Sequence, residues 1–205
     1  ENQSNLANKI HQDKSSLSNL KSQLAFYEEL VSQKEGYPSG VRTVLKSPKI
    51  YSGIIATVGD LFQMEEKYNI AFQAALGHWS KCLVSKDRDT AMNILSKAKK
   101  EEIGNLSILP LKELKALPFN SKEVPIGDHI LGSGVNLSGV SSFNEGLANA
   151  LVGNLLVVDN LENALKTHDL KGWDVVDLKG AYFGKNLLLK HQGKEEEGGL
   201  LGRTK

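Results

Sequence analysis

The first 36 residues carry a narrow, regular stripe of hydrophobic side chains. Its members recur at alternating intervals of four and three residues, broken only by Asp13: Leu6, Ile10, Leu17, Leu20, Leu24, Tyr27 and Val31. This seven-residue period is typical of a coiled coil, whereas a helix that packs on its own domain has a wider apolar face. We therefore predict a coiled-coil arm at 1–36 that needs a partner helix to bury its stripe. A long surface helix of an ordinary domain is the alternative.

From residue 41 onward, short apolar runs alternate with longer amphipathic stretches. This alternation predicts strands at 53–58, 81–84 and 105–110, and helices at 65–76, 88–100 and 111–117. The pattern favours an α/β, mixed α+β, fold with small mixed sheets and flanking helices. Pro118 and Pro125 then bracket a mostly polar segment, which predicts a linker at 118–125.

The second half of the chain repeats the pattern of the first. Residues 68–76 and 143–151 both begin with an aromatic residue and Asn, continue with an apolar face and end in Ala-Leu. Matching Tyr68 with Phe143 gives an offset of 75, and matching Val84 with Val157 gives 73, so the copies differ by a two-residue gap. An internal duplication predicts two similar subdomains related by an approximate two-fold axis. Chance similarity between two α/β units is the alternative.

These patterns divide the chain into five parts. We predict the arm at 1–36, a first subdomain at 37–117, the linker at 118–125, a second subdomain at 126–192 and a charged segment at 193–205. Because the chain begins at Glu1, without Met and inside a periodic segment, we expect it to be a piece of a longer protein.

Composition narrows the functional classes. The 25 Lys+Arg nearly balance the 24 Asp+Glu, and 40% of the residues are hydrophobic, which excludes a strongly basic nucleic-acid coat and an acidic disordered tail. A single cysteine, Cys82, excludes an intramolecular disulfide framework and suits a reducing compartment, so we expect a cytoplasmic protein. No stretch approaches the roughly 18 apolar residues of a membrane helix, and we expect no membrane partner.

No motif for catalysis, nucleotide binding or metal binding stands out. The glycine pair Gly180 and Gly184 has too short a spacing for a phosphate-binding loop, and Asn186 stands where Ser or Thr belongs. The five histidines are scattered along the chain, and no catalytic signature accompanies them. We therefore predict no enzymatic activity, no cofactor and no metal for this chain.

Basic residues gather near both ends of the globular part. We select five as candidate contacts to DNA phosphates: Arg42, Lys185, Lys190, Lys194 and Arg203. Several like charges on one surface would contact phosphates without reading the base sequence, since no series of stacking aromatics is interleaved with them.

Several segments, in order along the chain, resemble the hinge domain of prokaryotic SMC (structural maintenance of chromosomes) proteins. They follow the predicted arm and cover nearly the whole chain: 37–42, 53–61, 66–71, 75–77, 108–111, 154–159, 176–180 and 199–203. The resemblance implies a homodimerising hinge in a long antiparallel coiled coil, with 193–205 beginning the returning arm. It also implies a partner helix from the same parent chain, ATPase heads outside this sequence, association with the nucleoid, and a role in chromosome condensation and segregation.

The resemblance further implies that sheets from unlike subdomains of two protomers join edge to edge. The candidate edge segments are 105–109 and 173–190, and strand addition would satisfy their unpaired backbone groups. From them we select these interface residues: Asn105, Leu106, Ile108, Trp173, Val175, Val176, Gly180, Leu187 and Leu189. The family commonly carries the glycine series G-x6-G-x3-G-G beside this interface. Here Gly180 fits the first position, but Leu187, His191 and Gln192 stand at the others.

Two other classes of function stay open. One is a small-molecule-binding or catalytic α/β domain with a helical extension, which would place a pocket at 105–140. The other makes nucleic-acid binding the primary activity, with an affinity that falls steeply as salt increases.

Overall fold

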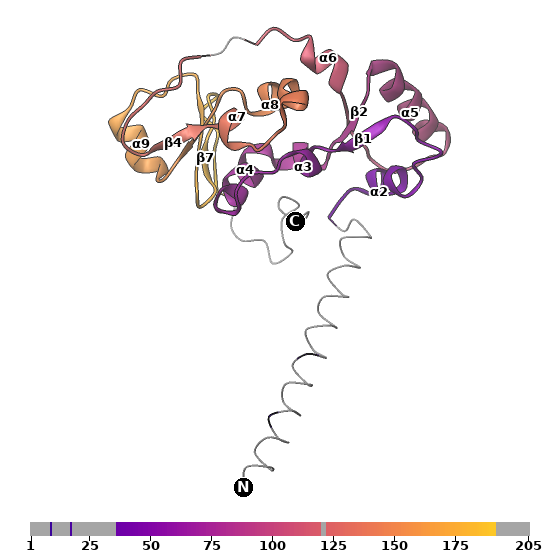
Figure 1. Ribbon diagram of the computed structural model, residues 1–205, viewed down its shortest axis with the longest axis horizontal. Helices are drawn as coiled ribbons and strands as arrows, with labels where there is room; N and C mark the ends of the chain where they lie inside the picture. The colour runs from indigo at the N-terminus through magenta and orange to yellow at the C-terminus, as the bar shows by residue number, and fades with distance from the viewer. Residues whose placement is uncertain (1–8, 10–16, 18–35, 120–121, 192–205) are drawn as a thin grey trace. The chain divides into compact units, whose positions relative to one another are not determined.

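The computed structural model describes residues 9, 17, 36–119 and 122–191 (Figure 1). The chain divides into two units, Glu1–Tyr37 and Pro38–Lys205. In the first unit Lys9 and Leu17 are helical. The rest of the predicted arm up to residue 35, and the segment 193–205, lie outside the described residues.

The second unit alternates short strands with helices (Figure 1). Its first half contains α2 (Ser39–Lys46), β1 (Ile54–Thr57), α3 (Val58–Leu61), the 3-10 helix η1 (Glu66–Tyr68), α4 (Asn69–Leu76), the 3-10 helix η2 (Gly77–Lys81), β2 (Leu83–Ser85), α5 (Arg88–Lys100), β3 (Ile108–Pro110) and α6 (Leu111–Lys115). Its second half contains β4 (Ile130–Ser133), α7 (Gly134–Leu137), the 3-10 helix η3 (Ser142–Asn144), α8 (Glu145–Val152), β5 (Leu155–Val158), α9 (Leu161–Thr167), β6 (Asp174–Asp177), β7 (Ala181–Phe183) and β8 (Leu189–His191). The predicted mixed fold is confirmed.

Helix starts are fixed by capping side chains at matching places in the two halves. Thr57 caps α3 and Ser133 caps α7, each by accepting a hydrogen bond from the backbone N–H three residues on. Asp87 caps α5, accepting from the Thr90 N–H at 2.9 Å, and Asn160 caps α9 in the same way. Each such cap stabilises its helix by about 1 kcal/mol. The predicted helix 88–100 is confirmed with both of its ends.

Each half contributes one sheet. The first sheet has the order β1-β2-β3, with β1 antiparallel and β3 parallel to β2. The second sheet repeats this arrangement in β4-β5-β6 and extends it with the antiparallel strands β7 and β8. A register shift occurs in both copies, in β1 and in β4. The strand pairing is thus duplicated together with the sequence pattern.

At the first strand and at the helix that follows it, the structure relates the two copies by an offset one residue larger than the match of Tyr68 with Phe143. Thr57 pairs with Leu83 and Ser133 with Leu156, so the offset is 76 at the first strand and 73 at the second. Helices α4 and α8 also differ by 76, which matches Tyr68 with Asn144. Both of these residues are buried, whereas Phe143 is 69% exposed. The predicted match of Tyr68 with Phe143 is therefore wrong, and that of Val84 with Val157 is confirmed.

The two halves share one hydrophobic core. Helix α4, from the first half, packs on β6 and β7 of the second half, and α6 packs on α8. Accordingly, one cluster of buried side chains includes Phe72 and Val84 from the first half and Leu147 and Val176 from the second. A separate cluster under α9, which includes Trp173 and Val175, fills the other face of the five-stranded sheet. The subdomains therefore stabilise each other by apolar burial rather than folding around separate cores.

Candidate dimerisation surface

Two strands in different halves have an open edge. Among the described residues, β3 pairs only with β2, and β8 pairs only with β7. An open edge presents backbone N–H and C=O groups that a further strand can pair with. The outer strands β1 and β4 also lie at sheet edges, but each is interrupted by a register shift, which discourages strand addition. The predicted edge segments 105–109 and 173–190 contain the starts of β3 and β8.

Exposed leucines lead into β8. The exposed fractions are 78% for Leu187, 56% for Leu188 and 68% for Leu189. Three consecutive apolar side chains at the start of an open edge strand form the kind of surface that protein contacts cover. On the other edge, Asn105 is exposed, and Leu106 and Ile108 are half-buried. Leu188 was missed by the sequence analysis because a leucine run alone does not distinguish a core strand from an edge strand.

Leu187 has an unusual backbone conformation. Its φ of 63° lies in the left-handed region that favours glycine. The strain arises in the β7–β8 turn, where the Leu187 N–H donates to the Gly184 carbonyl and the Gly184 N–H donates to the Leu188 carbonyl, each at 2.8 Å. Leu187 stands where the resemblance expects the second glycine of the series, and the backbone keeps the conformation that a glycine would adopt freely.

Four other predicted interface residues lie away from the open edges. Trp173 is buried just before β6, and Val175 and Val176 are buried on β6, which pairs with β5 on one side and β7 on the other. These side chains build the core of the chain. Gly180 is also buried and closes the β6–β7 turn at a φ of 83°, its N–H donating to the Asp177 carbonyl. The surface available to a partner therefore narrows to β8 and the residues that lead into β3.

Lys190 is engaged within its own sheet. Its Nζ lies 4.4 Å from the centre of the Tyr182 ring on the neighbouring strand β7. Burial lowers the pKa of Lys190, while the charge of Asp174 opposes that shift. The pKa of Tyr182 is raised to about 12, first by burial and then by the charge of Asp174 and hydrogen bonding to it. Lys190 thus belongs to a cross-strand cluster with Tyr182 and Asp174, which the sequence analysis missed because its members are joined only through strand pairing.

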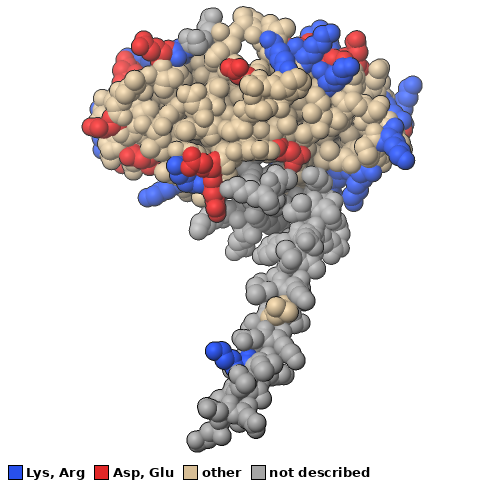
Figure 2. Space-filling view, in the orientation of Figure 1, with Lys and Arg blue, Asp and Glu red and all other residues tan. Residues whose placement is uncertain are grey.

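Of the other predicted DNA contacts, two lie among the described residues, and they belong to different halves of the chain. Arg42 is half-buried on α2, whereas Lys185 is exposed in the β7–β8 turn with its backbone N–H donating to Asp174 Oδ1 at 2.8 Å. Lys194 and Arg203 lie outside the described residues. In Figure 2 the middle of the face shown is largely uncharged, and Lys, Arg, Asp and Glu gather at its rim.

The described part of the chain gives little support for a metal site or for a reactive thiol. Within it, no group of three or more His, Cys, Asp and Glu residues could hold a metal ion. Cys82 is buried, and burial raises the pKa of its thiol, which disfavours the nucleophilic thiolate. Of the helices that the structure describes, none combines the length and apolarity that crossing a membrane requires.

Comparison with protein families gives a match over more than half of the chain. The family model described as SMC proteins Flexible Hinge Domain matches residues 51–168. The Chromosome partition protein Smc of Halothermothrix orenii is 26% identical over 163 residues, which cover 78% of this chain and 14% of that protein. The Chromosome partition protein Smc of Bacillus subtilis is 25% identical over 190 residues, covering 87% of this chain and 16% of that protein. The chain thus spans about a seventh of the length of these relatives.

Solved structures share the fold. A crystal structure of an asymmetric dimer of the Geobacillus stearothermophilus SMC hinge domain superposes with a TM-score of 0.77 at 20% identity, covering 94% of this chain and 80% of that one. The Pyrococcus furiosus SMC protein hinge domain gives a TM-score of 0.62 at 19% identity, covering 83% of this chain and 90% of that one.

Proposed function

The chain belongs to the SMC flexible hinge domain family, and from that membership we propose that it is a dimerisation hinge joining two coiled-coil arms of a chromosome-partition protein. The relatives named above are chromosome partition proteins, and one of the similar structures is a hinge dimer. The proposal places any ATP hydrolysis by the parent protein outside this chain, and it gives the hinge an architectural role in the cytoplasm, at the nucleoid.

The observation that carries the proposal is the pair of open strand edges in unlike halves. A two-fold dimer can pair β3 of one copy with β8 of the other, and the symmetry then makes the same junction twice. Each junction would satisfy backbone groups of both edges and cover the exposed leucines. The proposed contact residues are Asn105, Leu106, Ile108, Leu187, Leu188 and Leu189.

The same proposal assigns the remaining parts of the chain. Residues 1–36 would form one arm, paired with a helix of the same parent chain that begins in 193–205. The subdomains 37–117 and 126–192, joined by the linker 118–125, would form the body that holds the junctions. The candidates for contacts to DNA would be Arg42, Lys185, Lys194 and Arg203. Lys190 would not be among them, because its Nζ contacts the Tyr182 ring of the neighbouring strand.

The oligomeric state in solution tests the proposal. We expect light scattering to give twice the 22.4 kDa mass of the chain at high concentration, with dissociation on dilution. Replacing Leu188 and Leu189 with Glu should yield a folded monomer, because the charges would be desolvated at the junction. Ile126→Glu is the matched control, since Ile126 is 97% exposed and lies on neither edge. A wild-type chain that is monomeric at all concentrations would overturn the proposal.

A further inference from the structure

The first copy of the repeat carries three residues that the second copy lacks, and they lie at one place. Helices α4 and α8 keep the offset of 76, while β2 and β5 are offset by 73. From the end of each helix to the equivalent strand residues Leu83 and Leu156, the first copy therefore has six residues, 77–82, where the second has three, 153–155. The longer connection forms the 3-10 helix η2.

The η2 segment holds a large aromatic side chain at the surface in a fixed geometry. Trp79 is 41% exposed, and its ring stacks on His78 with centroids 4.9 Å apart. Its carbonyl accepts a hydrogen bond from the Cys82 N–H at 3.0 Å, and the Ser80 hydroxyl donates to the Gly77 carbonyl at 2.7 Å. Cys82 and Ser80 are both buried, so the turn that carries Trp79 is anchored to the core. A partly exposed Trp on an anchored turn is the kind of residue that dominates protein interfaces.

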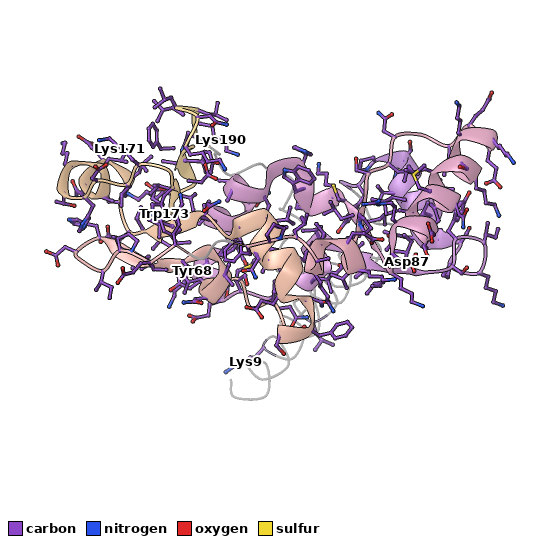
Figure 3. The ribbon with its side chains drawn as sticks, turned by 90° about the horizontal axis from the view of Figure 1, so that it is seen from above. Lys9, Tyr68, Asp87, Lys171, Trp173 and Lys190 are labelled. Atoms are coloured by element: carbon purple, nitrogen blue, oxygen red, sulfur yellow. The ribbon has the colours of Figure 1, made fainter. Side chains whose placement is uncertain are left out.

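The helix that precedes Trp79 packs on the five-stranded sheet, and its end lies near a side chain of the edge strand β8. Helix α4 packs on β6 and β7. At the end of α4, the position that a Cβ would take on Gly77 lies 4.0 Å from the Nζ of Lys190, which comes from β8. Figure 3 shows Lys190 beside the helical ribbon on this side of the sheet. The end of α4, where η2 begins, therefore lies near a side chain that β8 contributes to this face of the sheet.

We infer that Trp79 is an anchor of the dimer contact, packing on the strand that a second copy of this chain adds to β8. An added strand would lie about 4.8 Å beyond β8, and its side chains on the α4 face would extend the row formed by Val176, Tyr182 and Lys190. Trp79 stands two residues after Gly77, close to the Lys190 end of this row. The inference rests on the proposed dimer and identifies a residue outside both strand edges that strengthens it.

The dimer dissociation constant tests this inference. Trp79→Ala should raise the constant by about tenfold or more, as expected for a tryptophan that anchors an interface, and Trp79→Phe should recover part of the loss. Phe143→Ala is the control, because Phe143 is a more exposed aromatic residue on η3 in the second half. Sedimentation of each variant, with near-ultraviolet circular dichroism to confirm a folded chain, gives the comparison. An unchanged constant for a folded Trp79→Ala would overturn the inference.

A measurement on the unaltered chain gives an independent test. The chain has two tryptophans, and Trp173 is buried within the protomer. Dilution through the dissociation range should therefore shift the emission to longer wavelength, because Trp79 becomes exposed. Emission that stays constant while the mass halves would overturn the inference and leave the proposed dimer intact. A mass that never exceeds that of the monomer would instead defeat the proposed function itself.

Discussion

Gly139 lies directly against the backbone of Gln63, the residue that holds the same place in the other copy of the repeat. The two are related by the offset of 76 that also relates Thr57 to Ser133. A Cβ on Gly139 would lie 2.1 Å from the Gln63 carbonyl oxygen. The two equivalent loops, which follow α3 and α7, therefore meet where the halves join. Their contact helps to explain how a duplicated sequence forms one shared core.

Gly139→Ala should destabilise the chain by about 3 kcal/mol. The substitution adds the strain of a φ of +63° to a clash with backbone that cannot rotate away. Gly172→Ala is the control, since its φ is +80° but the nearest atom to its Cβ is the flexible Lys122 Nζ. That change should cost only about 1 kcal/mol. Urea denaturation measures both, and equal losses would contradict the close packing at the join.

Leu187→Asn should leave the protomer as stable as the wild type or make it more stable by up to about 1 kcal/mol. Asn tolerates the left-handed conformation that strains Leu187, and the leucine side chain is mostly exposed, so little apolar burial is lost. Leu189→Asn, at the exposed first position of β8, should instead destabilise the chain because Asn is a poor strand residue. Thermal denaturation at two protein concentrations separates this effect from that of dimerisation. A clear loss of stability in Leu187→Asn would show that the turn gains more from leucine than the strain costs.

Tyr182 should make the stability of the chain fall as the pH rises between about 10 and about 12. Its pKa is raised from 10.0 to about 12, so in that range the folded chain keeps a proton that the unfolded chain has released. The loss should be about 1 kcal/mol, less than the full shift implies, because the ring retains contact with solvent. Burial lowers the pKa of Lys190, which acts in the opposite direction.

The difference between wild type and Tyr182→Phe isolates this contribution. Tyrosinate absorbance should show one late-titrating group fewer in the variant than in the wild type, in which the pKa of Tyr51 is also raised. The stability of the variant should depend less steeply on pH above 10. Identical pH profiles for the two proteins would contradict the cluster with Asp174.

How far the sequence predicts this structure depends on whether a signal is local. Helix α5 could be predicted to the residue because its cap, Asp87, and its closing lysines are adjacent to it in the sequence. The match of Tyr68 with Phe143 was wrong because a 3-10 turn precedes both helices and buries different residue types in the two copies. The turn buries Tyr68 in the first copy but Asn144, not Phe143, in the second. Whether β6 is an edge or an interior strand depends on which strands lie beside it, and no local pattern carries that information.

The same distinction applies to the candidate site. Lys190 resembles the other basic residues in the sequence, and only the pairing of β7 with β8 places it over the Tyr182 ring. Leu187 and Leu189 could be selected as interface residues from the resemblance, but their exposure follows from the position of β8 at the end of the sheet order.

If duplex DNA binds to a basic surface of this chain, the affinity should depend on Lys185 and Arg42 rather than on Lys190. Lys185→Glu and Arg42→Gln should each weaken binding, and each lost phosphate contact should reduce the slope of log affinity against log salt by about 1. Lys166→Glu is the control, because Lys166 is an exposed lysine on α9 that pairs with Glu162 at 2.6 Å. Lys190→Met should leave DNA affinity unchanged, since its charge already lies against Tyr182 within the sheet. Fluorescence anisotropy over a salt series measures these effects. Equal affinities for wild type, Lys185→Glu and Arg42→Gln would remove both residues from any DNA-binding surface.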